Sequence, residues 1–244
     1  MPSLNIIGNI NLTGGEYKRN PFIATGGIVN TFTSGGLNYT SHTFISGSGT
    51  FSILNGESTA QVLVVGGGGG GTAGGDLTSR AFGGGAGGVN YTGSFFFKKN
   101  PEVGGPSNWT ALIGPGGLGG LNPTGTPGNP GTSGSISQLY ANYSYEQASF
   151  PLGGYGGTQE LSAGQGASGA GNAPTGGLAI YGPQGFAGGD LARAGGGGAA
   201  STGSSASGLF PYVGGNGGTG RGFTLQDGTL KYYGGGVAVE VLAA

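Results

Sequence analysis

The side chains that most often carry out chemistry are scarce in this chain. Histidine occurs once, at His42 in the strand-like run Thr-Ser-His-Thr-Phe, where we expect a structural or surface role. The nine acidic residues are scattered singly, so no pair of carboxylates suggests general acid–base catalysis. Cysteine is absent, which excludes disulfides and thiolate metal sites. We therefore expect no catalytic residues and no enzymatic activity.

Three carboxylates could supply oxygen ligands to a hard cation, because each lies beside a predicted loop or turn. They are Asp76, Asp190 and Asp227. None belongs to the cluster of acids that an EF-hand calcium loop requires. The sequence therefore predicts no metal site and no cofactor.

The charge balance limits the partners. Eight Lys and Arg residues against nine Asp and Glu residues give a formal net charge of −1. Such a chain lacks the basic surface that a polyanion needs, so we expect no nucleic-acid partner. An apolar run of about 18 residues is also missing, so we expect no membrane-spanning helix.

Aromatic side chains are the strongest candidates for a binding role. Several gather in segments between glycine clusters, and Tyr and Phe offer rigid contact area at a low cost in conformational entropy. A tyrosine can also stack on a sugar or hydrogen-bond a protein through its hydroxyl group. We expect a minority of these rings to contact a receptor while the others cover the scaffold. The candidates are Tyr140, Tyr143, Tyr145, Phe150, Tyr181, Phe186, Phe210 and Tyr212.

Glycine fills 65 of the 244 positions, and this high glycine content limits which structural elements can hold those rings in place. Glycine and proline interrupt the chain so often that a long helix, coiled coil or helical bundle is excluded. A disordered chain would carry few aromatic residues and a high net charge, and neither holds here. Glycine clusters recur at 66–71, 83–88, 114–120, 153–157, 164–171, 195–198, 214–218 and 234–236.

Ordering these runs costs backbone entropy, and glycine has no side chain whose burial could offset that cost. Backbone hydrogen bonds between neighbouring runs are the remaining source of stability. Extended helices with three residues per turn direct their N–H and C=O groups outward, where similar helices can pair with them. We therefore expect stacked polyglycine-II-type helices, with the intervening segments as loops at the ends of the stack. Flexible linkers are the alternative.

Short β-strands are expected around this glycine-rich body. Residues 42–53 predict a hairpin around a Ser-Gly-Ser-Gly turn. Residues 61–65 form an uninterrupted apolar run that suits a strand buried on both faces. Residues 237–242 alternate valine with other residues, and we expect this strand to pair with 61–65 and close the domain. Residues 135–150 contain a helical stripe, but their Ser, Asn and Tyr content favours strand or loop.

The expected fold class is therefore all-β, with short strands that close a base, an irregular glycine-rich body and essentially no α-helix. Two parts are expected. Residues 1–41 form an N-terminal strand segment, which either attaches the protein to something larger or supplies outer strands of one domain. Residues 42–244 form the glycine-rich domain that carries the recognition loops.

The order of these motifs resembles the glycine-rich domain of bacteriophage tail-fibre and adhesin proteins. The resemblance covers about residues 42–244 and rests on 62–65 with the polyglycine that follows, on 110–117 and on 128–134. In plan the chain is also similar to the adhesins at the long-tail-fibre tips of T-even phages. That resemblance implies a polyglycine sandwich whose variable loops contact the bacterial surface.

The resemblance further implies a function, a place and a set of partners. The protein would be a receptor-binding adhesin of the virion, assembled in the host cytoplasm, that recognises an outer-membrane protein or a glycan through its aromatic-rich loops. Residues 1–41 would join other fibre proteins, and both a monomer and a homotrimer stay open. One alternative is a structural virion or extracellular component that acts in assembly. Another is an ice-binding protein, against which the irregular glycine spacing argues.

Overall fold

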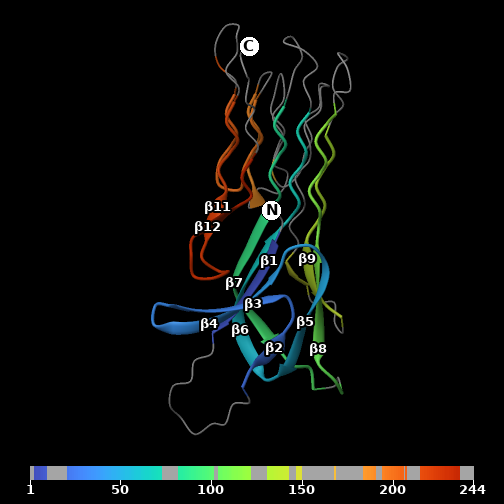
Figure 1. The fold of residues 1–244 in the computed structure, drawn as a ribbon, viewed down its shortest axis with the longest axis vertical. Helices are drawn as coiled ribbons and strands as arrows, with labels where there is room; N and C mark the ends of the chain where they lie inside the picture. The colour runs from blue at the N-terminus through green and yellow to red at the C-terminus, as the bar shows by residue number, and fades with distance from the viewer. Residues whose placement is uncertain are drawn as a thin grey trace.

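The computed structural model describes residues 3–9, 21–72, 82–101, 104–121, 131–142, 147–149, 168, 184–190, 194–205, 207 and 215–236. The molecule is elongated, with β-strands at one end and extended glycine-rich segments that run away from them (Figure 1). All regular elements in the described part are β-strands, which confirms the predicted fold class. No helix in that part is long and apolar enough to cross a membrane.

The described strands form two five-stranded antiparallel sheets and one hairpin, and neither sheet closes into a barrel. The first sheet has the order β3 (Ile28–Ser34), β4 (Leu37–Phe44), β1 (Ser3–Asn9), β6 (Glu57–Val65) and β7 (Val89–Lys98). The second sheet has the order β10 (Gln147–Ser149), β9 (Gln138–Ala141), β8 (Ser107–Ile113), β5 (Gly47–Asn55) and β2 (Ile23–Thr25). The hairpin consists of β11 (Arg221–Phe223) and β12 (Lys231–Tyr233).

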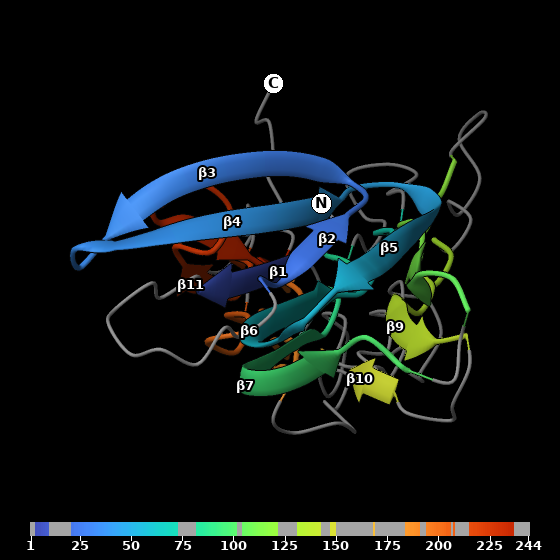
Figure 2. The same cartoon turned by 90° about the horizontal axis from the view of Figure 1, so that it is seen from below.

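The two sheets pack face to face around one hydrophobic core, and Figure 2 views them from the end opposite the glycine-rich segments. The first sheet contributes Val62 and Phe97, and the second contributes Phe51 and Trp109. The Phe97 ring packs edge-on against both Phe51 and Trp109, at centroid distances of 5.3 and 5.1 Å. Such aromatic pairs stabilise a core beyond the area they bury. The sandwich is therefore a rigid base.

Strand β6 is buried on both faces, as its apolar run predicted. Val62 and Val64 face the core between the sheets, whereas Leu63 and Val65 face a second cluster on the other side of the first sheet. Both edges of β6 are occupied, because β1 and β7 pair with it up to Val65. The predicted pairing of 61–65 with 237–242 is therefore wrong. Residues 237–242 themselves lie outside the described residues.

The predicted hairpin over 42–53 is also wrong. Strand β4 belongs to the first sheet and β5 to the second, so the chain crosses from one sheet to the other between Phe44 and Gly47. Phe44 and Phe51 both face the core between the sheets, and an alternating apolar pattern fits a crossover as well as a hairpin. Gly49, which was expected in the turn, lies in β5 against the ring of Phe44.

The described part of residues 1–41 is built into the sandwich. Strand β1 is the central strand of the first sheet, and β4 runs across the expected boundary at residue 41. Gly35 and Gly36 join β3 to β4 with φ angles of 59° and 78°, as two-residue hairpin turns require. A role of residues 1–41 in attachment to other virion proteins stays a prediction.

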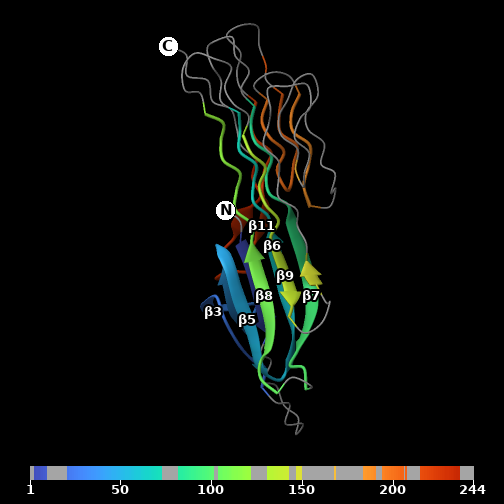
Figure 3. The ribbon, with the colours of Figure 1, turned by 90° about the vertical axis from the view of Figure 1, so that its right-hand side faces the viewer.

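The glycine-rich segments continue the strands away from the base, as Figure 3 shows from the side. Segment 66–72 follows β6, 82–88 leads into β7, 114–121 follows β8, and 131–137 leads into β9. Each segment therefore starts from a position and direction that a paired strand has already fixed.

Segment 66–72 has three distinct hydrogen-bonding faces. The N–H groups of Gly66, Gly69 and Thr72 donate to segment 82–88, with N···O distances of 2.8–3.1 Å. The N–H groups of Gly67 and Gly70 donate to Ser135 and Thr132, at 2.9 Å each. The carbonyls of Gly68 and Gly71 accept from Gly117 and Gly120, at 2.8 Å each. A repeat of three residues on every face is the signature of stacked polyglycine-II helices, so that prediction is confirmed.

A second group of segments packs beside the first through the same kind of bonds. Gly83 and Ala86 donate to Ala194 and Gly197, which joins segment 82–88 to segment 194–199. Segments 184–190, 201–205, 215–220 and 234–236 complete the array through further backbone hydrogen bonds. We call the whole array the shaft.

Candidate functional site

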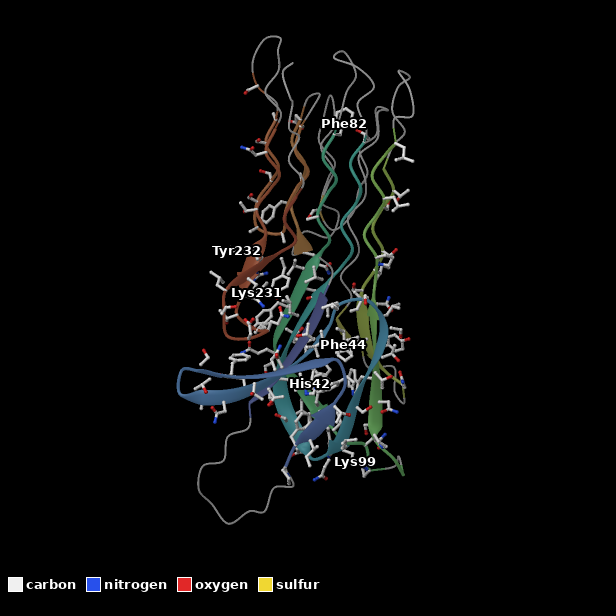
Figure 4. All side chains as sticks on the ribbon, in the orientation of Figure 1. His42, Phe44, Phe82, Lys99, Lys231 and Tyr232 are labelled. Carbon is white, nitrogen blue, oxygen red and sulfur yellow. The ribbon has the colours of Figure 1, made fainter. Side chains whose placement is uncertain are left out.

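The shaft has a distal end, away from the sheets, which the described parts of several segments reach. Segment 66–72 leaves β6 and reaches this end at Thr72, beside the start of segment 82–88 at Phe82. The Thr72 N–H donates to the Phe82 carbonyl at 3.1 Å, and the Phe82 N–H donates to Thr72 Oγ1 at 2.8 Å. Phe82 is buried and lies in the upper part of the shaft in Figure 4.

Described residues of other segments lie at the same end. Ala194 is bonded to Gly83, next to Phe82, and the Gly195 N–H donates to the Ser204 carbonyl. Ser204 donates in turn to the carbonyl of Asn216. The distal end therefore holds the described residues on either side of the sequence intervals 73–81, 122–130, 191–193 and 206–214.

Six of the eight predicted receptor-contacting residues lie outside the described residues: Tyr143, Tyr145, Phe150, Tyr181, Phe210 and Tyr212. Phe210 and Tyr212 belong to the interval 206–214, whose flanking residues are at the distal end. Their contact with a receptor stays a prediction.

The other two predicted residues are described, and both lie in ordered segments rather than in loops. Phe186 is part of the shaft, because its N–H donates to the Gly198 carbonyl at 2.9 Å, and its side chain is 42% exposed. Tyr140 is half-buried in β9, opposite Thr110 of β8. Both positions are displaced toward the base, so these two rings are not close to the distal end.

His42 is a buried structural residue of the base (Figure 4). Its Nδ1 lies 2.8 Å from the carbonyl oxygen of Gly26, which can only accept, so Nδ1 carries the proton. Its ring packs edge-on against Phe51 at 5.1 Å. Burial lowers the pKa of His42, and the hydrogen bond to Gly26 opposes this effect in part. The neutral imidazole therefore stabilises the junction of β2, β4 and β5.

The carboxylates considered as cation ligands have other surroundings. Asp227 Oδ2 pairs with Lys231 Nζ at 2.6 Å, and Oδ1 accepts from the Thr229 N–H at 3.1 Å. These hydrogen bonds, led by that of Lys231, lower the pKa of Asp227 to about 2. Asp190 is exposed, and Asp76 lies outside the described residues. Among the residues that the structure describes, no group of three or more acidic, His or Cys side chains could hold a metal ion.

A small open hollow of about 380 Å³ lies against the hairpin of β3 and β4. Its walls are Thr31, Phe32, Thr33, Asn38, Tyr39 and Thr40. The rings of Phe32 and Tyr39 stack at 5.4 Å, and the remaining groups are hydroxyls and one amide. These walls are uncharged and offer only weak neutral contacts.

Sequence reasoning overlooked several exposed apolar side chains on the described surface. Leu118 and Leu121 on the shaft are 76% and 74% exposed, and Tyr232 on β12 is 71% exposed. The two leucines stand three residues apart in a run of Pro-Gly-Gly-Leu-Gly-Gly-Leu. A test for a period of three, rather than 2 or 3.6, would have placed them on one face of a polyglycine-II helix.

Comparison with protein-family models matches residues 40–241 to a family described as a glycine-rich domain. The match starts within β4 and includes every described segment of the shaft. Comparisons with curated proteins and with solved structures gave no match.

Proposed function

The chain belongs to the glycine-rich domain family, and we propose that it is a receptor-binding adhesin of a bacteriophage tail fibre. In this proposal the base and the shaft are a scaffold, and the distal end recognises a protein or glycan of the bacterial surface. The observation that carries it is the repeated return of hydrogen-bonded segments to one end of the shaft. Sequence intervals that differ in length and composition are thereby anchored side by side.

The packing of the shaft supports its role as a scaffold. A Cβ atom at Gly67, Gly87 or Gly117 would lie far closer than 3.0 Å to the carbonyl oxygen of a neighbouring segment. The segments are therefore in direct main-chain contact, which leaves little room for them to slide or bend. Anchors held this firmly lower the conformational entropy that a binding loop loses on contact with a receptor.

Among the predicted aromatic residues, Phe210 and Tyr212 are the best placed for this role. The described residues on either side of their interval, 206–214, are at the distal end, and the interval also carries a leucine, a proline and a valine. It contains no charged residue, so recognition would depend on ring stacking, apolar contact and hydrogen bonds from the tyrosine hydroxyl. Tyr140 and Phe186 would serve as side contacts.

The test is binding of the recombinant protein to intact host cells or to their envelope fraction. Tyr212→Ala and Phe210→Ala should each weaken binding, by about 30-fold where the ring is a hot spot. Tyr232→Ala is the matched control, because this exposed tyrosine lies on β12, near the base. Circular dichroism would verify that all three variants fold.

Unchanged binding of both Tyr212→Ala and Phe210→Ala would refute the assignment of recognition to the interval 206–214. Equal weakening by Tyr232→Ala would also refute it, because the contact would then extend over the side of the molecule.

A second candidate function is a structural component of the virion that acts in assembly. The exposed leucines at positions 118 and 121 favour it, because apolar side chains on an ordered edge suit a protein contact. This function predicts no saturable binding to host cells.

A further inference from the structure

One edge of the shaft carries a row of exposed apolar side chains. Pro115, Leu118 and Leu121 are all exposed and follow each other at intervals of three residues. At a rise of about 3.1 Å per residue the row is about 19 Å long, with a side chain every 9 Å or so. Because a polyglycine-II helix repeats every three residues, these side chains form one straight ridge. We call it the leucine ridge.

Glycines beside the leucine ridge form a second, open row. Gly116 and Gly119 are exposed, and a Cβ atom on either would approach its nearest neighbour to only 3.5 or 4.0 Å. Gly117 and Gly120 point the opposite way, and their N–H groups donate into the shaft. Within the described residues, the N–H groups of Gly116 and Gly119 donate to no other backbone group. Along this edge, projecting side chains, open glycine positions and backbone N–H groups therefore each recur every three residues.

The chemistry of the ridge restricts what can cover it. The sequence contains no charged residue from 104 to 145, whereas exposed edges are usually protected by charges. A charged partner would gain nothing here, so the occupant must itself be uncharged along about 19 Å. Open glycines at every third position suit it, because glycines such as Gly67, Gly87 and Gly117 are what let the segments of the shaft itself approach closely. The same edge of a second copy satisfies both conditions.

The opposite side of the shaft indicates how two copies would meet. Exposed residues there include Thr202, Ser204, Asn216 and Thr219, which are polar. Ser204 Oγ donates to the Asn216 carbonyl, and Thr219 Oγ1 donates to Ser201 Oγ. Figure 1 shows these segments on the left and the ridge segment on the right. A head-to-tail contact would set leucines against hydroxyl and amide groups. A two-fold contact sets ridge against ridge.

We infer that the protein forms a two-fold symmetric homodimer through the leucine ridge. The two ridges run antiparallel, so that Leu118 and Leu121 of one protomer enter the open glycine row of its partner, as knobs enter holes in a coiled coil. The inference is independent of the adhesin function, because it concerns the side of the shaft and not its distal end.

Analytical ultracentrifugation over a range of protein concentrations tests the inference. The wild type should sediment as a dimer at high concentration, and the double variant Leu118→Asp, Leu121→Asp should dissociate at least tenfold more readily. Leu230→Asp is the matched control, because this leucine is also exposed but lies beside β12. The side chains at 118 and 121 are mostly solvent-exposed, so the double variant should keep the circular dichroism spectrum of the wild type. A monomeric wild type, a trimer, or a dimer unaffected by the double substitution would each overturn the inference.

Disulfide cross-linking tests the geometry independently, because the chain has no cysteine of its own. With Leu118 opposite the partner's Gly119 and Leu121 opposite the partner's Gly116, the two-fold axis passes beside Gly119, so two copies of Gly119→Cys should face each other across it. Mild oxidation should then give a covalent dimer much faster than for Gly104→Cys, which is exposed with open space around it but remote from the ridge. Equal cross-linking rates for the two variants would overturn the proposed contact.

Discussion

Two adjacent glycines of the shaft should respond in opposite directions to the same substitution. A Cβ atom at Gly67 would lie far closer than 3.0 Å to the carbonyl oxygen of Pro115, whereas at Gly68 it would lie 3.5 Å from its nearest neighbour, the carbonyl oxygen of Gly85. Neither residue has a positive φ, so alanine strains neither backbone. The comparison of Gly67→Ala with Gly68→Ala therefore isolates the contact between segments.

The expected magnitudes follow from that contact. To admit the methyl group at Gly67, segments 66–72 and 114–121 must separate by more than about 1 Å, which strains the bonds that Gly117 and Gly120 donate across this gap. Overpacking of this kind costs about 1–3 kcal/mol. Alanine offsets about 0.4–1 kcal/mol of it by lowering the entropy of the unfolded chain. The net loss at Gly67 is about 1–2 kcal/mol, whereas Gly68→Ala keeps the entropic gain alone.

Thermal unfolding measures both variants. At about 2–4 °C per kcal/mol, Gly67→Ala should lower the Tm by about 2–8 °C, and Gly68→Ala should raise it by about 1–4 °C. Circular dichroism follows the whole chain, and the single tryptophan, buried Trp109, reports on the base. Equal stabilisation by both substitutions would refute the close packing of the shaft, because freely moving glycine runs would accept a methyl group at either position.

Three further predictions concern single side chains. Because burial lowers the pKa of His42, the folded state favours the neutral ring. The stability that this preference contributes is fully present above the unfolded pKa of about 6.5 and is lost as the pH drops toward the folded pKa. Urea unfolding between pH 8 and 5 should show this slope, and His42→Gln should flatten it; an equal slope in both proteins would contradict it. NMR titration should give Asp227 a pKa of about 2, and Lys231→Gln should raise it, since the hydrogen bond from Lys231 is the main cause. Phe82→Ala should cost about 3–5 kcal/mol in urea unfolding, because this ring is 2% exposed; a loss below about 1 kcal/mol would show that the distal end of the shaft is loosely packed.

Local sequence patterns predicted the elements whose structure depends on residues close together in the sequence. The apolar run at 61–65 predicted a strand buried on both faces, and β6 is such a strand. Gly35 and Gly36 form a turn with positive φ angles, which is a conformation that a local Gly-Gly pair favours. The same kind of reasoning failed at 42–53, because an alternating pattern specifies which side chains face a core but not which sheet the next strand joins.

The candidate site was predicted with less success. Tyr140 and Phe186 were expected in loops but lie in β9 and in the shaft. Their neighbours in space, Thr110 and Gly198, are distant in the sequence, so no local pattern could have placed them. The leucine ridge was overlooked for a different reason, since its period of three belongs neither to a strand nor to an α-helix.

The amino-acid sequence alone determined that this protein is all-β and that its glycine runs stack as extended helices. Chains without side chains can be ordered only through their backbone groups, and that constraint follows from composition. The tertiary structure decided which runs are neighbours and that β1 lies between β4 and β6. Glycine segments carry no side-chain code for their partners, and those that adjoin β6, β7, β8 and β9 take their position from these strands.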